Sequence, residues 1–497
     1  LCRNEFKALF TLNPPVEFPS AIYIPHSAFI PHSFPPVAPL LVSKAKKVYI
    51  VLEDGTENVL TDSASYSLGE DDSNTDGAIF SKADLTINGS GTLTVNANYK
   101  HGIVSKDDLV ITDGNINVTS ASTAMEGKDS VKISGGTFNI SAGTNGIKST
   151  NTEASDKGFI SVTGGSFTVV ANNDAFEAET VLSIEGGSFD ITTGGGSANA
   201  SMKSDGTPNS DWHNNMGNGG DGPNGGMGRP DDNRNGMGGD PPTMPTADDT
   251  GLTIETAANT TTDSTDTTDS TSTSAKALKA GSEVNISGGE FKIDSADDSV
   301  HSNGSIVVTG GNISAASGDD GMHASGNLTI SDGTVDITKS YEGIEGSIVT
   351  IDGGTISVVS SDDGINCAGG SDTGSTDRMG ADQFSSQDGV ELNINRGTVT
   401  IDAEGDGLDS NGNFTMTGGT VCVCGPTNGG NGALDYNGTA TVTGGTLIAC
   451  GAVGMEEGFG DNSTQYSVLH DLGSTVSANE KLTITDSRQS TRQSKRL

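Results

Sequence analysis

Acidic side chains recur at one position of a short pattern, Asp/Glu-Gly-aliphatic-polar or a close variant, and three copies carry an Asp-Asp doublet there. The acidic residues of this pattern are Asp297, Asp298, Asp319, Asp320, Glu342, Asp362, Asp363 and Asp406. The polar position three residues later adds Glu345 and Asp409. If the copies stack as strands about 4.8 Å apart, like charges in a partly desolvated turn repel by a few kcal/mol. A dication removes that repulsion, and Ca²⁺ takes about six to eight oxygen ligands without a precise cage. The pattern therefore predicts a set of calcium ligands.

Aspartate is also a common turn former, because its side chain hydrogen-bonds to nearby backbone. A single Asp-Gly copy is explained by that property alone. The Asp-Asp doublets in three nearby copies favour the calcium interpretation instead.

The polar residue two places after the glycine is expected to form an outward-facing column. Its members are Glu126, Lys148, Glu177, Lys279, His301, His323, Glu345, Asn366, Asp409 and Asp435. Of these, His301, His323 and Asn366 are assigned to substrate binding. Two stacked histidines could bind zinc. Exposed histidines in an acidic groove are more often partners of carboxylates, and that interpretation is preferred.

These patterns belong to a longer repeat. A Gly-Gly pair, or a near equivalent, recurs every 21 to 23 residues where nothing intervenes, and a short alternating run follows it, as in Gly135-Gly136-Thr-Phe-Asn-Ile. A third short run, such as Asn327-Leu-Thr-Ile-Ser, precedes the next pair. The period predicts an all-β fold, a right-handed parallel β-helix or solenoid of about twelve coils with three short strands per coil. A sandwich or propeller would repeat over whole hairpins or blades.

A column of phenylalanines follows from the same register. Phe138, Phe167, Phe189 and Phe291 fall at equivalent positions, on the face that also carries the aliphatic side chains. They are therefore predicted to be core residues and not a platform for stacking sugars.

The composition limits the size of the core and the kinds of binding partner. With 70 glycines, 32% hydrophobic residues and 5% aromatics, the chain can build only a thin core. Its net charge of −39 argues against a nucleic-acid partner, because phosphate binding needs clustered Lys and Arg. No apolar run approaches the roughly 18–20 residues of a membrane-spanning helix, so no transmembrane segment is expected. A monomer is expected.

The chain is expected to divide into few parts. Residues 1–43 form a Pro-rich segment expected to be disordered or incomplete, and residues 486–497 form a polar tail. Residues 44–485 are assigned to the solenoid. A disordered insertion at 203–277 and a loop at 369–389 are expected to interrupt it, because their Asn, Gly, Asp, Ser and Thr residues cannot bury enough apolar surface.

The cysteines give little information about the compartment. Cys424 and Cys450 occupy the same place in successive copies, where the Cα distance would allow a disulfide. Parallel stacking gives poor dihedral angles, so they are expected to be unbonded. Cys367 is expected to be a buried thiol.

Several longer runs carry a family resemblance. Among them are Ser295-Ala-Asp-Asp-Ser-Val-His-Ser-Asn-Gly, Lys339-Ser-Tyr-Glu-Gly-Ile-Glu-Gly and Gly425-Pro-Thr-Asn-Gly-Gly-Asn-Gly-Ala-Leu-Asp-Tyr. Over about residues 44–485 the sequence resembles the clostridial family of carbohydrate-binding β-helix proteins. The resemblance implies a fold similar to pectate-lyase-type polysaccharide lyases, bound calcium on the intact Asp-Asp-Gly positions, and binding of cellulose and acidic plant polysaccharides. Ser299 departs from the pattern, because it replaces the glycine after the first doublet.

The expected function is therefore extracellular, calcium-dependent binding of plant cell-wall polysaccharide, such as cellulose or pectin, without catalysis. Oxygen-only calcium sites of modest affinity would stay empty in a cytosol, which favours an exterior location although no signal peptide is visible. The first alternative is a calcium-dependent pectate lyase with Lys339 as base, because Lys339 is expected to be the basic residue beside the acidic cluster and is also assigned to substrate binding. The stacked acidic positions of successive repeats are called the acidic ladder below. The second alternative, a structural surface adhesin, predicts no such ladder.

Overall fold

The structure is a computed structural model that describes residues 38–67, 75–200, 274–368 and 386–474. It also describes the backbone of four short strands outside these ranges, β1 (Ser20–Ile24), β2 (Phe29–Ile30), β40 (Thr483–Ile484) and β41 (Gln493–Ser494). The chain divides into two units, residues 1–202 with 273–497 and residues 203–272, and all described residues belong to the first. The expected insertion at 203–277, the loop at 369–389 and the terminal segments 1–43 and 486–497 fall mostly outside the described residues.

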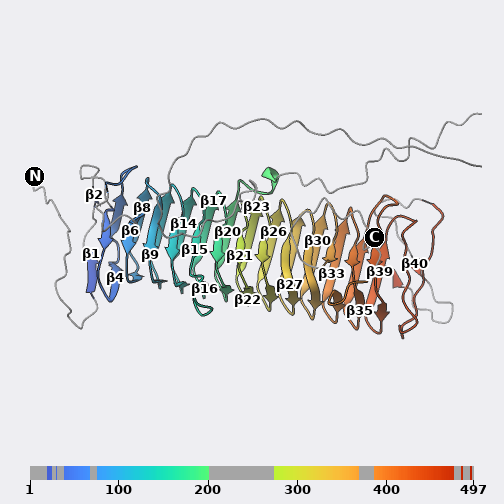
Figure 1. Ribbon diagram of the computed structural model, residues 1–497. Coiled ribbons are helices and arrows are strands. Elements are labelled where there is room, and N and C mark those ends of the chain that lie inside the picture. The colour runs from blue at the N-terminus through green and yellow to red at the C-terminus, as the bar shows by residue number, and fades with distance from the viewer. Residues whose placement is uncertain are drawn as a thin grey trace, which may run out of the picture. The chain divides into compact units, whose positions relative to one another are not determined.

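Nearly every described strand pairs in parallel with the strand three places further along the chain, as β11 does with β14. The strands therefore form three columns, and Figure 1 shows successive strands lying side by side in chain order from blue to red. The exception to parallel pairing is the antiparallel pair β40–β41.

The first column is a sheet of 14 strands. Its members are β2, β5 (Glu57–Thr61), β8 (Thr92–Ala97), β11 (Asn115–Ser120), β14 (Thr137–Ala142), β17 (Ser166–Ala171), β20 (Ser188–Thr193), β23 (Glu290–Ser295), β26 (Asn312–Ser317), β28 (Thr334–Lys339), β30 (Thr355–Ser360), β33 (Thr398–Ala403), β36 (Thr420–Cys424) and β39 (Thr446–Cys450).

The second column is made of the short runs that precede each Gly-Gly pair. Its members are β1, β4 (Lys47–Leu52), β7 (Asp84–Gly89), β10 (Asp108–Ile111), β13 (Ser130–Ile133), β16 (Phe159–Val162), β19 (Val181–Ile184), β22 (Glu283–Ile286), β25 (Ser305–Val308), β32 (Glu391–Ile394), β35 (Asn413–Met416) and β38 (Ala440–Val442).

The third column carries the acidic pattern. Its members are β3 (Leu40–Val42), β6 (Gly77–Ser81), β9 (His101–Ser105), β12 (Met125–Gly127), β15 (Ile147–Ser149), β18 (Phe176–Ala178), β21 (Leu278–Ala280), β24 (Val300–Ser302), β31 (Ile365–Cys367), β34 (Leu408–Ser410) and β37 (Leu434–Tyr436). Two long strands, β27 (Met322–Ile330) and β29 (Ile344–Ile351), belong to the second and third columns at once.

The predictions of an all-β fold, parallel pairing and three strands per period are confirmed for the described repeats, apart from those two fused strands. The one helix described, η2 (Ser197–Asn199), is a single 3-10 turn. The described part of the chain has no helix long and apolar enough to cross a membrane.

The predicted phenylalanine column lies in the core. Phe138, Phe167, Phe189 and Phe291 are register partners with at most 4% of their surface exposed. Their rings stack in parallel with centroids 4.6–4.8 Å apart. The prediction that these rings fill the core is confirmed.

The second glycine of each pair makes this register possible. Gly165 has a φ of 118°, which L side chains rarely adopt, and a Cβ on it would come 3.1 Å from the ring of Phe167. Glycine is therefore required at the corner that directs each phenylalanine inward.

Replacing Phe167 by leucine removes a ring that stacks on both neighbours. We expect Phe167→Leu to lower the free energy of unfolding by about 1–2 kcal/mol, because ring stacking adds to the buried area that is lost. Val170 lies on the same strand with 49% of its surface exposed, so Val170→Ala is the matched control and should change stability by about 0.5 kcal/mol or less. Denaturant titration of the two variants measures the difference, and equal effects would contradict the core assignment.

Candidate functional site

Two columns of polar side chains run beside each other along the third column of strands. The strand column consists of register partners: Glu126, Lys148, Glu177, Lys279, His301, His323, Glu345, Asn366, Asp409 and Asp435. The turn column consists of the residues three positions earlier in each repeat, including Asp174, Lys276, Asp298, Asp320, Glu342, Asp363 and Asp406. The stacking expected from the sequence is thus present, whereas a role of these residues as ligands remains a prediction.

Backbone amides of the next repeat fix the turn carboxylates. Oδ1 of Asp298 accepts a hydrogen bond of 3.2 Å from the backbone N–H of Asp320, and Oδ1 of Asp363 accepts one of 2.6 Å from that of Asp406. Each of these aspartates therefore hydrogen-bonds to the backbone of the next repeat. In Asp298 the second oxygen, Oδ2, contacts other side chains.

Lysines neutralise the carboxylates in the earlier repeats. Lys148 Nζ lies 2.8 Å from Glu177, and Lys279 Nζ lies 3.2 Å from Asp174. Since lysine and glutamate alternate along the strand column from Glu126 to Lys279, charge is balanced within the protein there.

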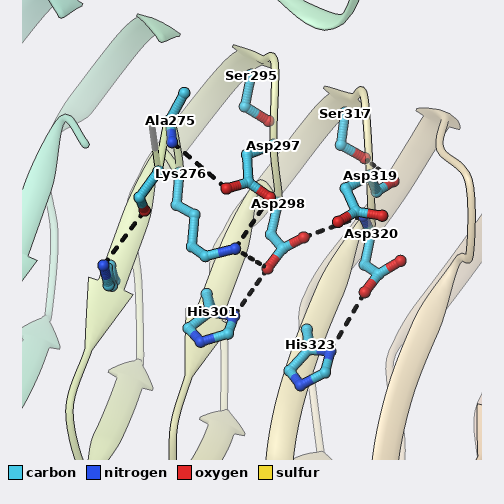
Figure 2. A network of polar contacts seen from close by, with 12 residues as sticks. Ala275, Lys276, Ser295, Asp297, Asp298, His301, Ser317, Asp319, Asp320 and His323 are labelled. Carbon is cyan, nitrogen blue, oxygen red and sulfur yellow. Dashed lines mark hydrogen bonds and ion pairs between the residues drawn. The ribbon is translucent and has the colours of Figure 1, made fainter. Parts of the chain in front are cut away.

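Lys276 ends this compensated section. Its Nζ lies 2.9 Å from Oδ1 of Asp297 and 2.7 Å from Oδ2 of Asp298 (Figure 2). The side chains of Lys276 and Asp298 are 10% and 1% exposed. Burial alone would raise the pKa of Asp298, but the ammonium of Lys276 and a hydrogen bond from His301 outweigh it, so this pKa lies well below its usual range. Burial acts to lower the pKa of Lys276, yet the two aspartates raise it overall.

Sequence reasoning missed Lys276, because the expected insertion extended to residue 277. Ala275 and Ala277 are buried, so the repeat resumes before that boundary. A signal was available: Leu278 is the register partner of Val300, which places Lys276 at the position of Asp298 in the preceding repeat.

The two histidines are buried, which corrects the expectation that they are exposed. His301 is 5% exposed and His323 is fully buried. His301 Nδ1 lies 2.7 Å from Oδ2 of Asp298, and His323 Nδ1 lies 3.2 Å from Oδ2 of Asp320. Their rings stack with centroids 5.0 Å apart in consecutive repeats, as Figure 2 shows. Both histidines contact carboxylates of the turn column and do not project into solvent.

Lys339 does not occupy the expected place beside the acidic cluster. It is the last residue of β28, in the first column, and its Nζ donates a 2.6 Å hydrogen bond to the backbone carbonyl of Ser197. The basic side chain against the carboxylates is Lys276. The expectation that Lys339 is the well-placed base is therefore wrong.

The later repeats hold carboxyl groups without lysine partners. Within the described ranges, no lysine or arginine lies within 4.0 Å of Asp320, Glu342, Asp363, Asp406 or Asp409. Burial, followed by neighbouring carboxylates, raises the pKa of Asp409 to about 8 and that of Asp406 to about 6. The same causes hold the pKa values of Asp320, Glu342 and Asp363 well above their usual range.

Oxygen atoms converge in this uncompensated section. A Cβ on Gly405 would come 2.5 Å from Oδ1 of Asp362 and 2.5 Å from Oδ1 of Asp363, so the glycine leaves room for both carboxylates. Asn366 donates a 3.0 Å hydrogen bond to Oε2 of Glu342, while its buried Oδ1 accepts none from any described residue. Carboxylate and amide oxygens are the donors that Ca²⁺ prefers, so this part of the ladder fits the ion.

The upstream doublet fits a dication less well. Asp297, Asp298 and Asp319 each offer an oxygen within 4.8 Å of the others. Since Lys276 already contacts two of the three, an ammonium supplies the positive charge there. Of the predicted metal ligands, the structure thus separates a lysine-neutralised group from the later Glu342, Asp362, Asp363, Asp406 and Asp409.

The cysteines are free thiols in the described residues. Cys424 and Cys450 are register partners on β36 and β39, and neither forms a disulfide, as expected. Cys367 is fully buried, and burial raises the pKa of its thiol, which confirms the prediction of a buried cysteine.

Comparisons with known proteins agree with a role in carbohydrate binding. A family model described as "carbohydrate-binding domain-containing protein" matches residues 35–321 and 322–432. A carbohydrate-binding domain-containing protein of Acetivibrio thermocellus is 49% identical over 82 residues, which make up 16% of this chain and 29% of that protein. The chain therefore matches less than a third of that relative's length.

One solved structure is also similar, a polysaccharide lyase-like protein from C. thermocellum in a gadolinium derivative. The match has 38% identity and covers 36% of this chain and 71% of that chain, with a TM-score of 0.34, which is too low to support an inference. The family model spans well over half of the sequence. On that ground, the chain belongs to the family of carbohydrate-binding domain-containing proteins.

Proposed function

We propose that this chain is an extracellular protein that binds acidic plant cell-wall polysaccharide, such as pectin, or cellulose through calcium held in the later repeats. We also propose that its parallel strands form a right-handed β-helix of about twelve coils, each contributing one position to the acidic ladder. The observation that carries the proposal is the end of lysine compensation at Lys276 and Lys279. Beyond these residues, no lysine or arginine of the described ranges lies within 4.0 Å of Asp320, Glu342, Asp363, Asp406 or Asp409.

The residues that would hold calcium are Glu342, Asp362, Asp363, Asp406 and Asp409. Their partial burial and like charge make a bound dication favourable, because it removes the mutual repulsion of the carboxylates. Gly405 keeps the space between Asp362 and Asp363 open. Bound calcium would supply open coordination positions for the carboxylates of a polyuronate. This mode of binding needs no aromatic platform.

The lysines of the two columns near the acidic residues, Lys148, Lys276 and Lys279, are each ion-paired with a carboxylate, which does not favour the lyase alternative. The neighbouring aspartates raise the pKa of Lys276, so it stays protonated near neutral pH and cannot accept a proton from a sugar. Lys339 hydrogen-bonds to Ser197 in a different column. Binding is therefore the function that the geometry supports best. The adhesin alternative does not account for a stack of carboxyl groups that, within the described ranges, continues past the last lysine partners.

Exterior location is part of the same proposal. Oxygen-only calcium sites of modest affinity fill at the millimolar calcium levels outside cells and stay empty at cytosolic levels. Without calcium, the carboxyl groups of the ladder would stay partly protonated and would contribute nothing to polysaccharide binding.

Incubating the protein with polygalacturonate and with cellulose, in calcium and in chelator, tests the proposal. We expect polygalacturonate to retain the protein in calcium and to release it in chelator, without absorbance from unsaturated products. Product absorbance would establish the lyase instead. Retention that ignores the chelator, or no retention on either polymer, would contradict calcium-dependent binding.

A further inference from the structure

Two Asp-His pairs stand in consecutive repeats with the same spacing. In the first, His301 Nδ1 contacts Oδ2 of Asp298 at 2.7 Å, and in the second, His323 Nδ1 contacts Oδ2 of Asp320 at 3.2 Å. Each histidine follows its aspartate by three positions, and the two are register partners. The backbone therefore presents the same pair twice.

The third group at each pair differs in charge. Oδ2 of Asp298 also contacts Nζ of Lys276 at 2.7 Å, so an ammonium completes the first pair. Nδ1 of His323 also lies 2.5 Å from Oε2 of Glu345, so a second carboxylate completes the other. Glu345 follows His323 in the strand column of the next repeat.

We propose that Asp320, His323 and Glu345 form a separate site for a borderline transition-metal dication such as Mn²⁺ or Zn²⁺. One ligand atom from each residue lies within 4.8 Å of the other two. The imidazole nitrogen selects against calcium, which takes oxygen ligands, and favours the first-row transition metals and zinc. His323 and Asp320 are buried, as first ligands of such a metal commonly are, and the side chain of Glu345 is 13% exposed.

The formal charges favour a dication over a simple ion pair. When both are ionised, Asp320 and Glu345 carry two negative charges, and an imidazolium at His323 would return only one. A dication on a neutral imidazole compensates both carboxylates, whereas the two aspartates of the preceding repeat share the single charge of Lys276. Imidazole and carboxylate are both ligand types that these ions accept in proteins.

The repeats also hold the three ligands in place before any ion arrives. The backbone N–H of Asp320 donates to Oδ1 of Asp298, which fixes the aspartate. His323 and Glu345 lie on the long strands β27 and β29, which pair along most of their length. This inference does not depend on the calcium proposal, because its three ligands are not among the five residues that would hold calcium, although Glu345 shares a repeat with Glu342.

Titrating the metal-free, full-length chain with Mn²⁺ and recording pulsed electron paramagnetic resonance tests the site. We expect wild type to show nitrogen coupling from one imidazole bound to Mn²⁺. His323→Gln should abolish the coupling and weaken that Mn²⁺ site by about tenfold or more, since loss of even an outer partner of a ligand typically costs about 10–100-fold. His301→Gln is the matched control and should keep the coupling, because Lys276 already neutralises its aspartate.

Glu345→Gln provides a second variant that retains both imidazoles. It should keep nitrogen coupling while weakening the Mn²⁺ affinity, which addresses the case in which His323→Gln fails to fold. Three outcomes overturn the site: Mn²⁺ bound with oxygen ligands only, coupling lost in His301→Gln but kept in His323→Gln, or no Mn²⁺ binding. An oxygen-only signal that disappears on adding calcium would leave the calcium ladder intact and refute the histidine site alone.

Discussion

Replacing Lys276 by methionine is expected to lower the free energy of unfolding by about 3–5 kcal/mol at neutral pH, because it leaves a buried carboxylate without its cation. Asp298 is fully buried and receives its nearest positive charge from this ammonium. Methionine keeps the length of the side chain, so the loss reports mainly on charge. Denaturant titration of the intact chain measures the effect.

The exposed pair Lys292–Asp190 supplies the control for that substitution. Its atoms are 3.4 Å apart, and the side chains are 78% and 58% exposed. Lys292→Met should therefore cost less than about 1 kcal/mol. Adding Asp298→Asn to the Lys276→Met chain should recover much of the lost stability, since it removes the stranded charge. Equal effects of the two lysine substitutions would contradict the role given to Lys276.

The pH dependence of Lys276→Met has a definite sign. In wild type the pKa of Asp298 lies below its usual value of 3.8, so its contribution to stability is present above that value and is lost as pH falls toward the folded pKa. Methionine removes the largest cause of the low pKa of Asp298, while the hydrogen bond from His301 remains. The difference between the two proteins should therefore be large at pH 7 and should shrink as the pH falls below about 4.

Calcium is expected to stabilise the protein, and more strongly at pH 8 than at pH 5. The folded state raises the pKa of Asp406 to about 6 and that of Asp409 to about 8, from 3.8 in each case. In chelator the folded chain therefore binds more protons than the unfolded chain between these values, and its stability falls as pH rises through them. Calcium replaces the protons, and at about 100 times its dissociation constant it adds about 2.7 kcal/mol. Thermal unfolding at several pH values, with calcium and with chelator, measures this.

Gly405→Ala should remove most of that calcium effect. The new Cβ would come 2.5 Å from Oδ1 of Asp362 and 2.5 Å from Oδ1 of Asp363, so the two carboxylates would have to move. Gly458 has no atom within 4 Å of such a Cβ and no positive φ, so Gly458→Ala should retain the full calcium response. If Gly405→Ala responds to calcium as wild type does, the ligands lie elsewhere on the chain.

The regular parts of this molecule could be predicted from the sequence because local patterns specify them. Alternation and paired glycines determine which side chains point inward, and the register of the phenylalanine and strand columns follows from the period alone. Burial of His301 and His323 could not be predicted this way. Alternation directs them away from the core, and they are covered by carboxylates of their own and neighbouring repeats, such as Asp320 and Glu345 around His323.

Lys276, the cation that contacts Asp297 and Asp298, was not predicted because the expected insertion included it. Lys276 follows a long run of Thr, Ser and Asp, so composition assigned it to a disordered excursion, and only its register with Asp298 places it in the ladder. Lys339 was misplaced for a related reason. Its proximity in sequence to Glu342 says nothing of the direction of a long, flexible side chain, which here reaches Ser197.

The fused strands β27 and β29 have a mechanical consequence. A stack of repeats bends at its turns, since turn residues absorb changes in φ and ψ that strands resist. In these two repeats one strand belongs to both the second and the third column, and the pairing of β27 with β29 shifts register between Ala324 and Asn327, where other repeats turn. His323 and Glu345 stand on the third-column part of these strands, directly before that shift. If the proposed cation binds there, the residues at the register shift between Ala324 and Asn327 are where the backbone of these repeats can adjust to it.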